Sequence, residues 1–371
     1  MKVCLITKYF HPILGGIENH CYNLAKKLTE RGIDVEVHTS QDTPTKKRVL
    51  PKFEILEGVK VIRHKSFSFF IPSGKYDVIH LHNFDILPHF LIFLNILIRR
   101  LLGLKTLKII LTLHGGFTPW WNNFMPLKRI LKKAYHLSIG KLFLKYVVDK
   151  IIALNDWEKE QLVKHGIPAK KIIVIPNGID DMAYELPPKK SSKFNVYRPY
   201  ILFLGRISKE KNLDFIIECL RDCDSINFLI AGPVNDIKYF NKIIALIKKY
   251  GLDKRVIFVG EVYGAEKYEL IDNSVAVVLF SFYETDPLVI KEAMARGKPV
   301  IVSNNEPFTY IIKKNENGFL VRNCSEFIRF VNFLLTNPSV SEGISHINKR
   351  TSIQYMWNHI ISKIIEVYRH S

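Results

Sequence analysis

Two glutamates eight positions apart, Glu284 and Glu292, are the residues of this chain whose types and spacing are best suited to chemistry. The apolar run 275–280 predicts a strand before Glu284, and Pro287 suits the first turn of a helix that ends near Gly297. Ligands of open parallel sheets bind beyond the carboxyl ends of the strands, so the pair suggests recognition of a hydroxyl-rich ligand. Taken alone, the same spacing also fits a helix-capping aid and a solvated helix acid, and the other motifs must decide.

Two further loops carry groups that suit phosphate. Gly15 and Gly16 stand where the first predicted strand passes into a helix, and glycines there let backbone N–H groups approach an anion, although a plain tight turn would use them too. Arg206 and Lys211 follow a later strand, where a guanidinium fork and an ammonium would hold phosphate oxygens. Both could be ordinary solvated cations, but their place in a strand-to-helix loop favours phosphate binding.

Histidines end two of the predicted strands. His114 is followed by two glycines, which leave its imidazole with little steric cover. His80 and His82 alternate on a strand and therefore share one face. Metal binding is the sharper hypothesis for that pair, but no carboxylate or cysteine completes a site, so core packing is favoured.

The elements that must position these residues follow a regular strand–helix rhythm. Predicted strands occupy 3–7, 34–40, 77–81, 108–114 and 150–154, and then 200–205, 227–232, 255–260, 275–280 and 299–303. Helical patterns fill the gaps, as at 16–31, 156–165, 212–221 and 236–250. This alternation predicts parallel sheets covered by helices on both faces. A Pro-, Lys- and Ser-rich stretch, 184–193, predicts a boundary near residue 190, so that the domains are 1–190 and 191–350, followed by a C-terminal helical segment, 351–371.

Composition narrows the class of protein. With 371 residues, 47% hydrophobic and 24% charged, the chain is expected to be globular and large enough for two domains. The five cysteines complete no zinc pattern and are expected to be buried thiols in a reducing cytoplasm. No cleavable signal pattern is recognised, and the longest apolar stretch, 90–98, is far shorter than the about 20 residues of a membrane span.

The positive charge is concentrated in one region. The net charge is +19, and residues 86–150 hold eleven Lys or Arg against one acid. In 126–137, apolar residues recur at helical spacing with lysine and arginine between them, just after Trp120 and Trp121. Basic amphipathic helices of this kind predict contact of residues 117–147 with an anionic membrane surface. The alternative is that the apolar face packs on the first sheet. Nucleic-acid binding is the competing class, but no recognised motif supports it.

Taken together, these residues resemble the retaining nucleotide-sugar glycosyltransferases of the GT-B fold, specifically glycosyltransferase family four (glycosyl transferases group 1). The resemblance covers nearly the whole chain, and six motifs agree with the family in order and spacing. They are Gly15-Gly16-Ile17-Glu18, His114-Gly115, residues 175–180, Arg206 with Lys211, Ala231-Gly232-Pro233, and Glu284 with Glu292. Thr285-Asp286-Pro287 departs from the family's Gly-Phe-Gly and puts an anion, Asp286, close to the expected positions of the sugar and diphosphate.

The resemblance implies two Rossmann-like domains facing across a cleft. Domain 1–190 would bind the acceptor, domain 191–350 would bind the nucleotide sugar, and 351–371 would return to the first domain. Each of the motif residues receives a role by the same resemblance. Arg206, Lys211, Gly15, Gly16, Pro233 and the amides of Leu288 and Val289 would hold the donor, Glu292 would bind the ribose, and His114 and Glu284 would contact the transferred sugar as the catalytic pair.

The expected function is transfer of a sugar, with retention at the anomeric carbon, to a hydroxyl acceptor that is lipid-linked or part of a surface glycan. No metal or other cofactor is expected, and the protein is expected in the cytoplasm, peripheral to the membrane face. Two alternatives stay open. Asp286 suggests a degenerate protein that binds nucleotide sugars without turnover, and the net charge leaves a nucleic-acid-binding protein as the less favoured one.

Overall fold

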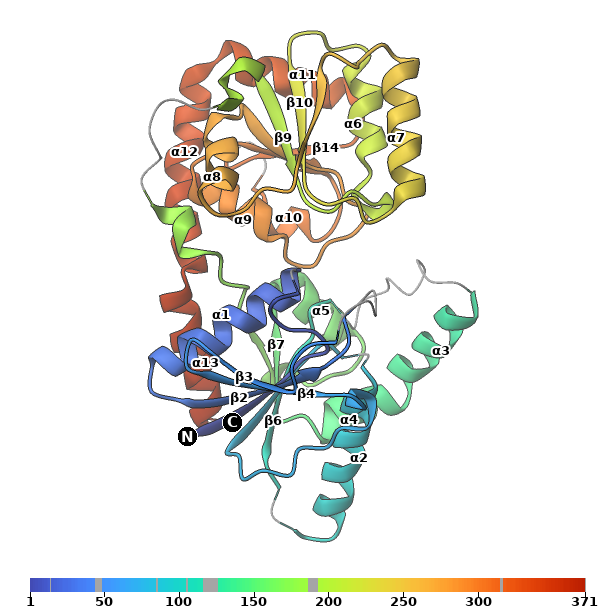
Figure 1. The fold of residues 1–371 in the computed structure, drawn as a ribbon, viewed down its shortest axis with the longest axis vertical. Coiled ribbons are helices and arrows are strands. Elements are labelled where there is room, and N and C mark those ends of the chain that lie inside the picture. The colour runs from blue at the N-terminus through green and yellow to red at the C-terminus, as the bar shows by residue number, and fades with distance from the viewer. Residues whose placement is uncertain are drawn as a thin grey trace. The chain divides into compact units, whose positions relative to one another are not determined.

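The computed structural model describes residues 1–13, 15–43, 49–84, 86–104, 106–115, 126–185, 193–313 and 316–370. The chain forms two compact units, drawn in Figure 1. Unit 1 comprises Met1–Gly178 and Trp357–Ser371, and unit 2 comprises Ile179–Met356. The two α/β units with parallel sheets that the sequence predicts are confirmed.

The units divide at residues 178/179 and 356/357, not at the predicted 190/191 and 350/351. Ala183 is already buried in the core of unit 2, and the Tyr184 hydroxyl donates to the Ser352 carbonyl oxygen at 2.7 Å. At the other crossing the Trp357 ring packs on Gly178, where an added Cβ would lie 2.6 Å from the ring. Residues 186–192, most of the predicted boundary stretch, lie outside the described residues.

Unit 1 is built on an eight-stranded sheet in the order β3-β4-β2-β1-β5-β6-β7-β8. All neighbours are parallel except β3 and β4. The strands are β1 Lys2–Ile6, β2 Asp34–Ser40, β3 Phe53–Leu56, β4 Val59–His64, β5 Val78–His82, β6 Lys108–Thr112, β7 Lys150–Ala153 and β8 Ile172–Val174. The helices are α1 Gly16–Glu30, α2 Leu87–Leu101, α3 Pro126–Leu137, α4 Ile139–Tyr146, α5 Asp156–Lys164 and α13 Trp357–His370.

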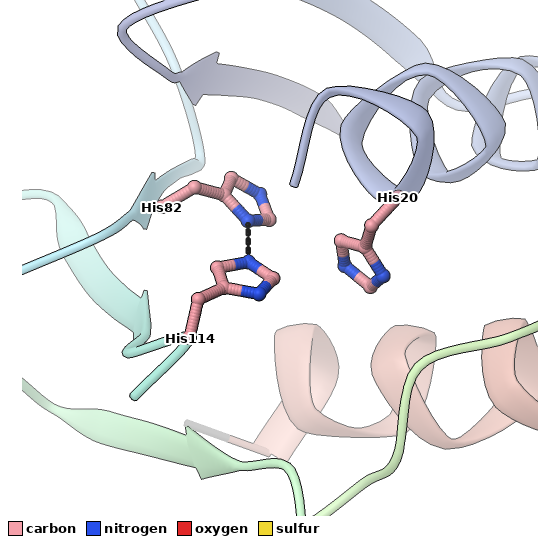
Figure 2. Close-up of side chains that lie close together, drawn as sticks. All are labelled: His20, His82 and His114. Atoms are coloured by element: carbon pink, nitrogen blue, oxygen red, sulfur yellow. Dashed lines mark hydrogen bonds between the residues drawn. The ribbon is translucent and has the colours of Figure 1, made fainter. Parts of the chain in front are cut away.

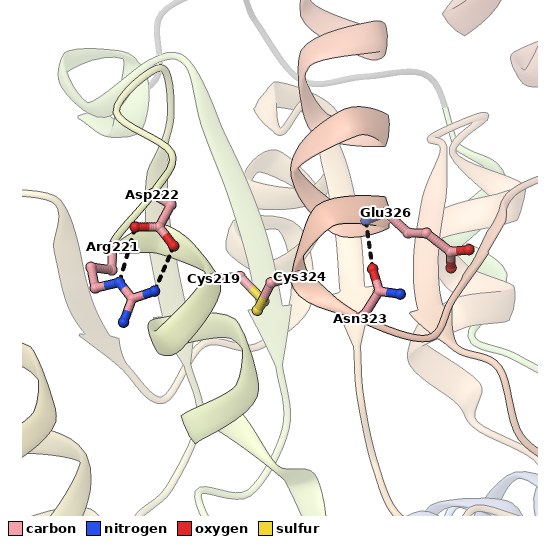
Figure 3. Close-up of a disulfide and its surroundings, with 6 residues drawn as sticks. All are labelled: Cys219, Arg221, Asp222, Asn323, Cys324 and Glu326. Atoms are coloured by element: carbon pink, nitrogen blue, oxygen red, sulfur yellow. Dashed lines mark hydrogen bonds and ion pairs between the residues drawn. A yellow bond between two sulfur atoms is a disulfide. The ribbon is translucent and has the colours of Figure 1, made fainter.

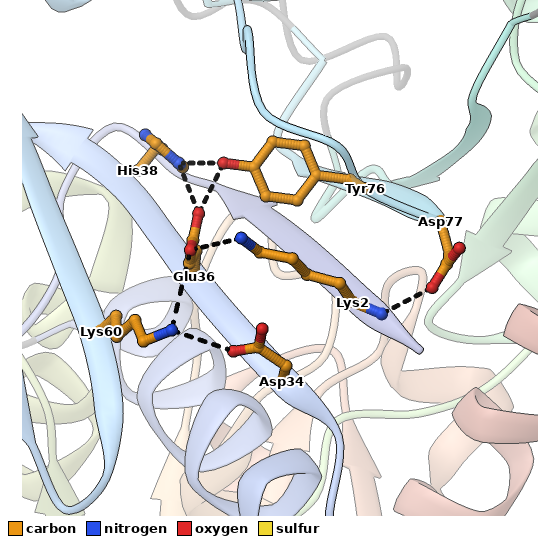
Figure 4. A network of polar contacts seen from close by, with 7 residues as sticks. All are labelled: Lys2, Asp34, Glu36, His38, Lys60, Tyr76 and Asp77. Atoms are coloured by element: carbon orange, nitrogen blue, oxygen red, sulfur yellow. Dashed lines mark hydrogen bonds and ion pairs between the residues drawn. The ribbon is translucent and has the colours of Figure 1, made fainter.

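Apolar side chains cover both faces of this sheet. One core cluster joins it to α1 and α13, and the other joins it to α2, α4 and α5. Polar groups also tie the strands together, as Figure 4 shows: Glu36 on β2 accepts from Lys2 Nζ on β1 at 2.7 Å and from the Tyr76 hydroxyl, just before β5, at 2.6 Å. Lys60 on β4 reaches Asp34 on β2 at 3.4 Å. These contacts join β4, β2, β1 and the segment just before β5, which are neighbours in the sheet.

Unit 2 contains a fully parallel six-stranded sheet in the order β11-β10-β9-β12-β13-β14. The strands are β9 Tyr200–Leu204, β10 Asn227–Ala231, β11 Val256–Gly260, β12 Ala276–Leu279, β13 Val300–Ser303 and β14 Phe319–Val321. The helices are α6 Leu213–Leu220, α7 Ile237–Lys249, α8 Gly264–Asn273, α9 Leu288–Ala295, α10 Phe308–Ile311, α11 Cys324–Thr336 and α12 Pro338–Ser352.

In both sheets the chain reverses the direction in which it adds strands next to the first strand, and we call this point the direction change of the sheet. In unit 2 the chain runs from β9 outward to β10 and β11 and then returns to β12 on the other side of β9. In unit 1, β2 and β5 flank β1 in the same way. Loops that leave two such strands diverge at the carboxyl edge of the sheet, and ligands of open α/β sheets bind at these points.

A disulfide joins two helices of unit 2. Cys219 on α6 and Cys324, the first residue of α11, are bonded, with their Cα atoms 4.9 Å apart (Figure 3). The expectation that all cysteines are thiols is therefore wrong for this pair, which lies 105 positions apart in sequence and meets only because α6 and α11 pack together. Cys4, Cys21 and Cys223 are buried free cysteines, as predicted.

None of the described helices combines the length and the apolar character needed to cross a membrane.

Candidate active site

Glu284 and Lys211 meet at the direction change of the unit 2 sheet. Lys211 ends a short 3-10 turn after β9, and Glu284 lies in the loop after β12. The Lys211 Nζ is 2.5 Å from Glu284 Oε1, and the Ser281 hydroxyl donates to the same oxygen at 2.8 Å. An ammonium has three donors, so Lys211 keeps two for another anion. Within the described part of the chain no group donates to Glu284 Oε2, which can therefore accept a ligand hydroxyl.

Backbone contacts hold these two loops in place. The Phe282 N–H donates to the Glu210 carbonyl oxygen at 2.9 Å, which joins the loop after β12 to the turn after β9. The Asn305 side chain, beyond β13, donates to the Ser281 carbonyl oxygen at 3.0 Å. Ser281 and Asn305 were not singled out from the sequence, because their roles depend on loops that are adjacent only in the folded sheet.

Arg206 lies in the first of two loops, after β9 and after β10, that approach each other very closely. A Cβ on Gly232 would lie 2.0 Å from the Gly205 carbonyl oxygen, and Gly232 has a φ of +140°, so only glycine fits there. The Pro233 carbonyl oxygen accepts from the Ile207 N–H at 2.8 Å, which places Pro233 in the loop beside Arg206. The Arg206 side chain is exposed and forms no hydrogen bond or ion pair with the residues that the structure describes. Its guanidinium is available for an anionic ligand.

The start of α9 presents two backbone donors. The N–H groups of Leu288 and Val289 form no hydrogen bond with any described residue, and the first turn of a helix also carries a partial positive charge. Pro287, the N-cap residue, ends the loop that carries Glu284. The predicted donor-binding amides therefore follow Glu284 by four and five residues on one continuous segment.

Glu292 lies one turn inside α9 and is buried. The Lys267 ammonium, from α8, donates to Glu292 Oε1 at 2.9 Å. Burial raises the pKa of the Glu292 carboxyl, and the charge and hydrogen bond of Lys267 oppose that shift. Lys267 was missed in the sequence, because it belongs to a different helix 25 positions earlier.

Asp286 does not present its charge as the sequence suggested. Its carboxylate forms an ion pair with the Lys291 ammonium, and their side chains are only 2% and 1% exposed. The same ammonium lies 4.3 Å from the centre of the Tyr355 ring. Burial lowers the pKa of Lys291, while the Asp286 carboxylate opposes the shift. The charge of Asp286 is thus compensated inside unit 2, and the reason for suspecting a degenerate protein is removed.

In unit 1, three histidines gather at the carboxyl edge of the sheet (Figure 2). His82 ends β5, His114 follows β6, and His20 projects from α1. His82 Nδ1 and His114 Nε2 are 3.1 Å apart and share a hydrogen bond. Burial lowers the pKa of both imidazoles well below its usual value, so both are neutral near pH 7. His20 was not singled out from the sequence, because its helical position alone shows no ligand role.

His80 has a different environment from His82, although the two side chains share one face of β5 as predicted. Its imidazole contacts the Tyr368 hydroxyl at 2.7 Å and the Thr112 hydroxyl at 2.8 Å, and it is fully buried. Burial lowers its pKa to about 3. His80 is therefore a neutral core group that helps to hold α13 against the sheet.

The backbone around His114 is held in an unusual conformation. His114 and Gly115 both have positive φ, of 51° and 80°. The Gly115 N–H donates to Glu158 Oε1 at 2.7 Å, and the other carboxylate oxygen of Glu158 accepts from the Leu154 N–H at 2.7 Å. The buried Glu158 side chain therefore joins the loop after β6 to the loop after β7 and orients His114.

Gly15 and Gly16 differ in the space around them. A Cβ on Gly15 would lie 2.2 Å from the Glu18 carboxylate, which folds back over the start of α1. A Cβ on Gly16 would have no neighbour within 4 Å. The first turn of α1 is thus open at Gly16, where a ligand could approach.

The basic helix α3 exposes its apolar residues. Leu127, Ile130 and Leu131 are 72%, 64% and 62% exposed, so the interpretation that these side chains pack on the first sheet is wrong. The neighbouring helices add further exposed apolar residues to unit 1, namely Leu94, Ile98 and Leu101 on α2 and Ile139, Leu142 and Tyr146 on α4. Residues 116–125, including both tryptophans of the predicted membrane segment, lie outside the described residues.

Known protein families and individual relatives match this chain over nearly its whole length. Residues 14–182 match the family model of Glycosyltransferase Family 4, and residues 188–351 match that of Glycosyl transferases group 1. An uncharacterized glycosyltransferase from Methanocaldococcus jannaschii is 26% identical over 411 residues, covering 100% of this chain and 98% of the relative. The GDP-mannose:cellobiosyl-diphosphopolyprenol alpha-mannosyltransferase from Komagataeibacter xylinus is 24% identical over 386 residues, covering 100% and 93%. The crystal structure of Anabaena HepE in complex with UDP-glucose has a TM-score of 0.79 at 19% identity, covering 100% of both chains.

Proposed function

The chain belongs to glycosyltransferase family 4, with the two Rossmann-like units of the GT-B fold, and from this premise we propose that it transfers a sugar from a nucleoside-diphosphate sugar to a hydroxyl acceptor with retention at the anomeric carbon. The observation that carries the proposal is the convergence at the direction change of the unit 2 sheet. There Lys211 contacts Glu284, the N-terminus of α9 follows Glu284 on the same segment, and Arg206, in the loop after β9, pairs with none of the described residues.

The arrangement suits a diphosphate leaving group. Arg206, the two remaining donors of Lys211 and the N–H groups of Leu288 and Val289 supply positive potential where charge develops as the glycosidic bond to phosphate breaks. Fixed donors of this kind need no reorganisation during the reaction, and we expect transfer without a metal ion. The test is addition of EDTA to purified enzyme, which should leave the rate of transfer unchanged.

The carboxylates then recognise hydroxyl groups. Glu284 Oε2 would accept from a hydroxyl of the transferred sugar, and Glu292, held by Lys267, would accept from the ribose. In unit 1, His114 would contact a sugar hydroxyl, and Gly15 and Gly16 would form the second anion-binding turn. These assignments follow the family motifs, and each can be tested by substituting the residue.

The acceptor is proposed to be lipid-linked. The Komagataeibacter relative is named for a diphosphopolyprenol acceptor, and this chain exposes Leu127, Ile130 and Leu131 beside Lys132 and Lys133 on α3. A basic residue near an anionic bilayer contributes about 1 kcal/mol, and exposed leucine and isoleucine side chains add hydrophobic burial. We therefore propose peripheral binding of unit 1 to the cytoplasmic face of a membrane that carries the acceptor.

Two measurements test the enzymatic proposal. A thermal-shift screen of UDP, GDP and ADP and of their sugars should find one donor series that stabilises the protein, because a ligand that binds only the folded state raises its stability. With that donor, Glu284→Gln should lose most of the transfer activity, and Glu342→Gln, on the exposed surface of α12, should keep it. Equal activity of the two variants would remove Glu284 from the site.

The membrane proposal is tested by flotation with vesicles. Binding should need anionic lipid, and the double variant Ile130→Glu/Leu131→Glu should lose it while keeping its thermal shift with the donor. Equal flotation with neutral and anionic vesicles would contradict the proposed surface.

A further inference from the structure

The three histidines of unit 1 converge from elements that are far apart in the sequence. Each of His20, His82 and His114 offers one ring nitrogen, and these atoms all lie within 4.8 Å of one another (Figure 2). His20 and His82 are buried, and His114 is partly exposed. Among the described residues this is the one group of three or more His, Cys, Asp or Glu side chains close enough to share an ion.

The ligand types of the group indicate which ion fits. Imidazole is a common side-chain ligand for transition-metal ions, and each of the three rings offers one nitrogen. The group contains no carboxylate, so it offers little to Mg²⁺ or Ca²⁺, which require oxygen ligands. Imidazole ligands instead favour Zn²⁺, Ni²⁺, Co²⁺ and Cu²⁺.

The separations are close to those of a tetrahedral site. With bonds of about 2.0–2.1 Å, two nitrogen ligands of Zn²⁺ lie roughly 3.3 Å apart. His82 Nδ1 and His114 Nε2 are 3.1 Å apart, close to that separation, and an ion bound by both would replace the hydrogen bond between them. The three ligand nitrogens all lie within 4.8 Å of one another, so a shift of at most roughly 1.5 Å, which rotation of a side chain can supply, brings them to that separation.

We propose that His20, His82 and His114 form a binding site for a Zn²⁺-type divalent cation, with the fourth position left to water or a ligand hydroxyl. The ion is not a cofactor of transfer. When the ion is bound, the His114 imidazole ligates the ion and cannot contact the sugar. The inhibition that follows rests on the proposed function, in which that imidazole contacts the sugar. Zn²⁺ is therefore a reversible inhibitor of the enzyme, and Mg²⁺ is not.

The binding step is tested without any activity measurement. Co²⁺ is titrated into full-length protein without a histidine tag, and its visible absorption is recorded. The expected result is one equivalent bound, with bands of nitrogen and oxygen ligands and no thiolate charge-transfer band. His20→Asn and His82→Asn should each weaken binding at least about tenfold, whereas His346→Asn, on the exposed surface of α12, should not. Circular dichroism shows whether each variant is folded.

Several results would overturn the site. They are no bound Co²⁺ or Zn²⁺ at micromolar concentration in the wild-type protein, a thiolate band that assigns the ion to a cysteine, and equal affinity of folded His20→Asn and His346→Asn. Inhibition is measured separately, as the Zn²⁺ dependence of transfer in wild type and His20→Asn. If no transfer is detected with any donor, the proposed function fails while the Co²⁺ spectrum still decides the site.

Discussion

Replacing one member of the buried Asp286–Lys291 ion pair is expected to destabilise the protein by about 3–5 kcal/mol, because the other charge then stays in a low-dielectric interior and loses this ion pair. Both side chains are almost fully buried, and the Lys291 ammonium also faces the Tyr355 ring. Replacing both with apolar residues of similar size removes the two charges together. The double variant Asp286→Leu/Lys291→Met should therefore be within about 1 kcal/mol of the wild type, or more stable.

The two single variants should respond to pH in opposite directions. Burial already lowers the pKa of Lys291, so in Asp286→Leu, where the opposing carboxylate is gone, the ammonium loses its proton more readily. The cost of a lowered lysine pKa is present while the buried group is charged and disappears as pH rises, so the deficit of Asp286→Leu should shrink from pH 7 to pH 9.5. In Lys291→Met the deficit should shrink as pH falls, because protonation removes the carboxylate charge.

Urea unfolding measures these changes, with two probes that separate the units. All four tryptophans belong to unit 1 by sequence, so their fluorescence reports that unit, while far-UV circular dichroism reports both. The singles should shift the circular dichroism transition, and the double should restore it. Losses below about 1 kcal/mol in the singles, or a double variant as unstable as their sum, would show that the pair is solvated and would refute the account of Asp286.

Three further outcomes follow from the structure. Arg206→Ala should lower kcat/KM for the donor about 10²–10³-fold by removing a fixed cation from the leaving group, while Arg206→Lys keeps part of it, as steady-state kinetics would show. In Lys267→Met the loss of donor affinity at acidic pH should begin at a higher pH. The pKa of the buried Glu292 carboxyl is already raised, and this variant removes the positive charge that opposes the shift; titration of nucleotide binding from pH 5.5 to 8.5 measures this. Removing the Cys219–Cys324 disulfide, which closes a loop of 105 residues, should lower the free energy of unfolding by up to about 4–5 kcal/mol, read from urea midpoints.

Each outcome has a control. Arg221→Ala changes an exposed arginine paired with its neighbour Asp222 (Figure 3) and should keep the wild-type kinetics. Lys242→Met removes an exposed lysine on α7 and should leave the pH profile unchanged; the same shift in both lysine variants would contradict the role of Lys267. Alkylation of the unfolded protein without reductant should modify three cysteines, and modification of all five would show that the disulfide is not formed.

Local pattern was enough to predict most of the fold. The strand predicted at 34–40 is β2 with the same bounds, and α1 ends one residue before its predicted end. Four strands were missed. Ile172–Val174 and Phe319–Val321 hold only three residues each, which is too few for a period to show. Phe53–Leu56 and Val59–His64 interleave polar with apolar residues, as half-buried strands do, and this signal was overlooked.

In the candidate site, too, some features could be predicted from the sequence and others could not. Glu284 and Lys211 could be named from the sequence because each follows a predicted strand, and strands of a parallel sheet end at one edge. Their mutual contact could not be predicted, since it depends on β9 and β12 being neighbours although two strands lie between them in the chain.

The sequence by itself determined the strand–helix rhythm, the two α/β units and the family motifs, because hydrophobic periodicity and loop motifs act over a few neighbouring residues. Only the tertiary structure decided what each charged or sulfur-bearing side chain meets. It paired Asp286 with Lys291, brought Lys267 to Glu292, added His20 to the histidine group and joined Cys219 to Cys324. Such contacts depend on burial and on distances between separate elements, which no local window of sequence contains.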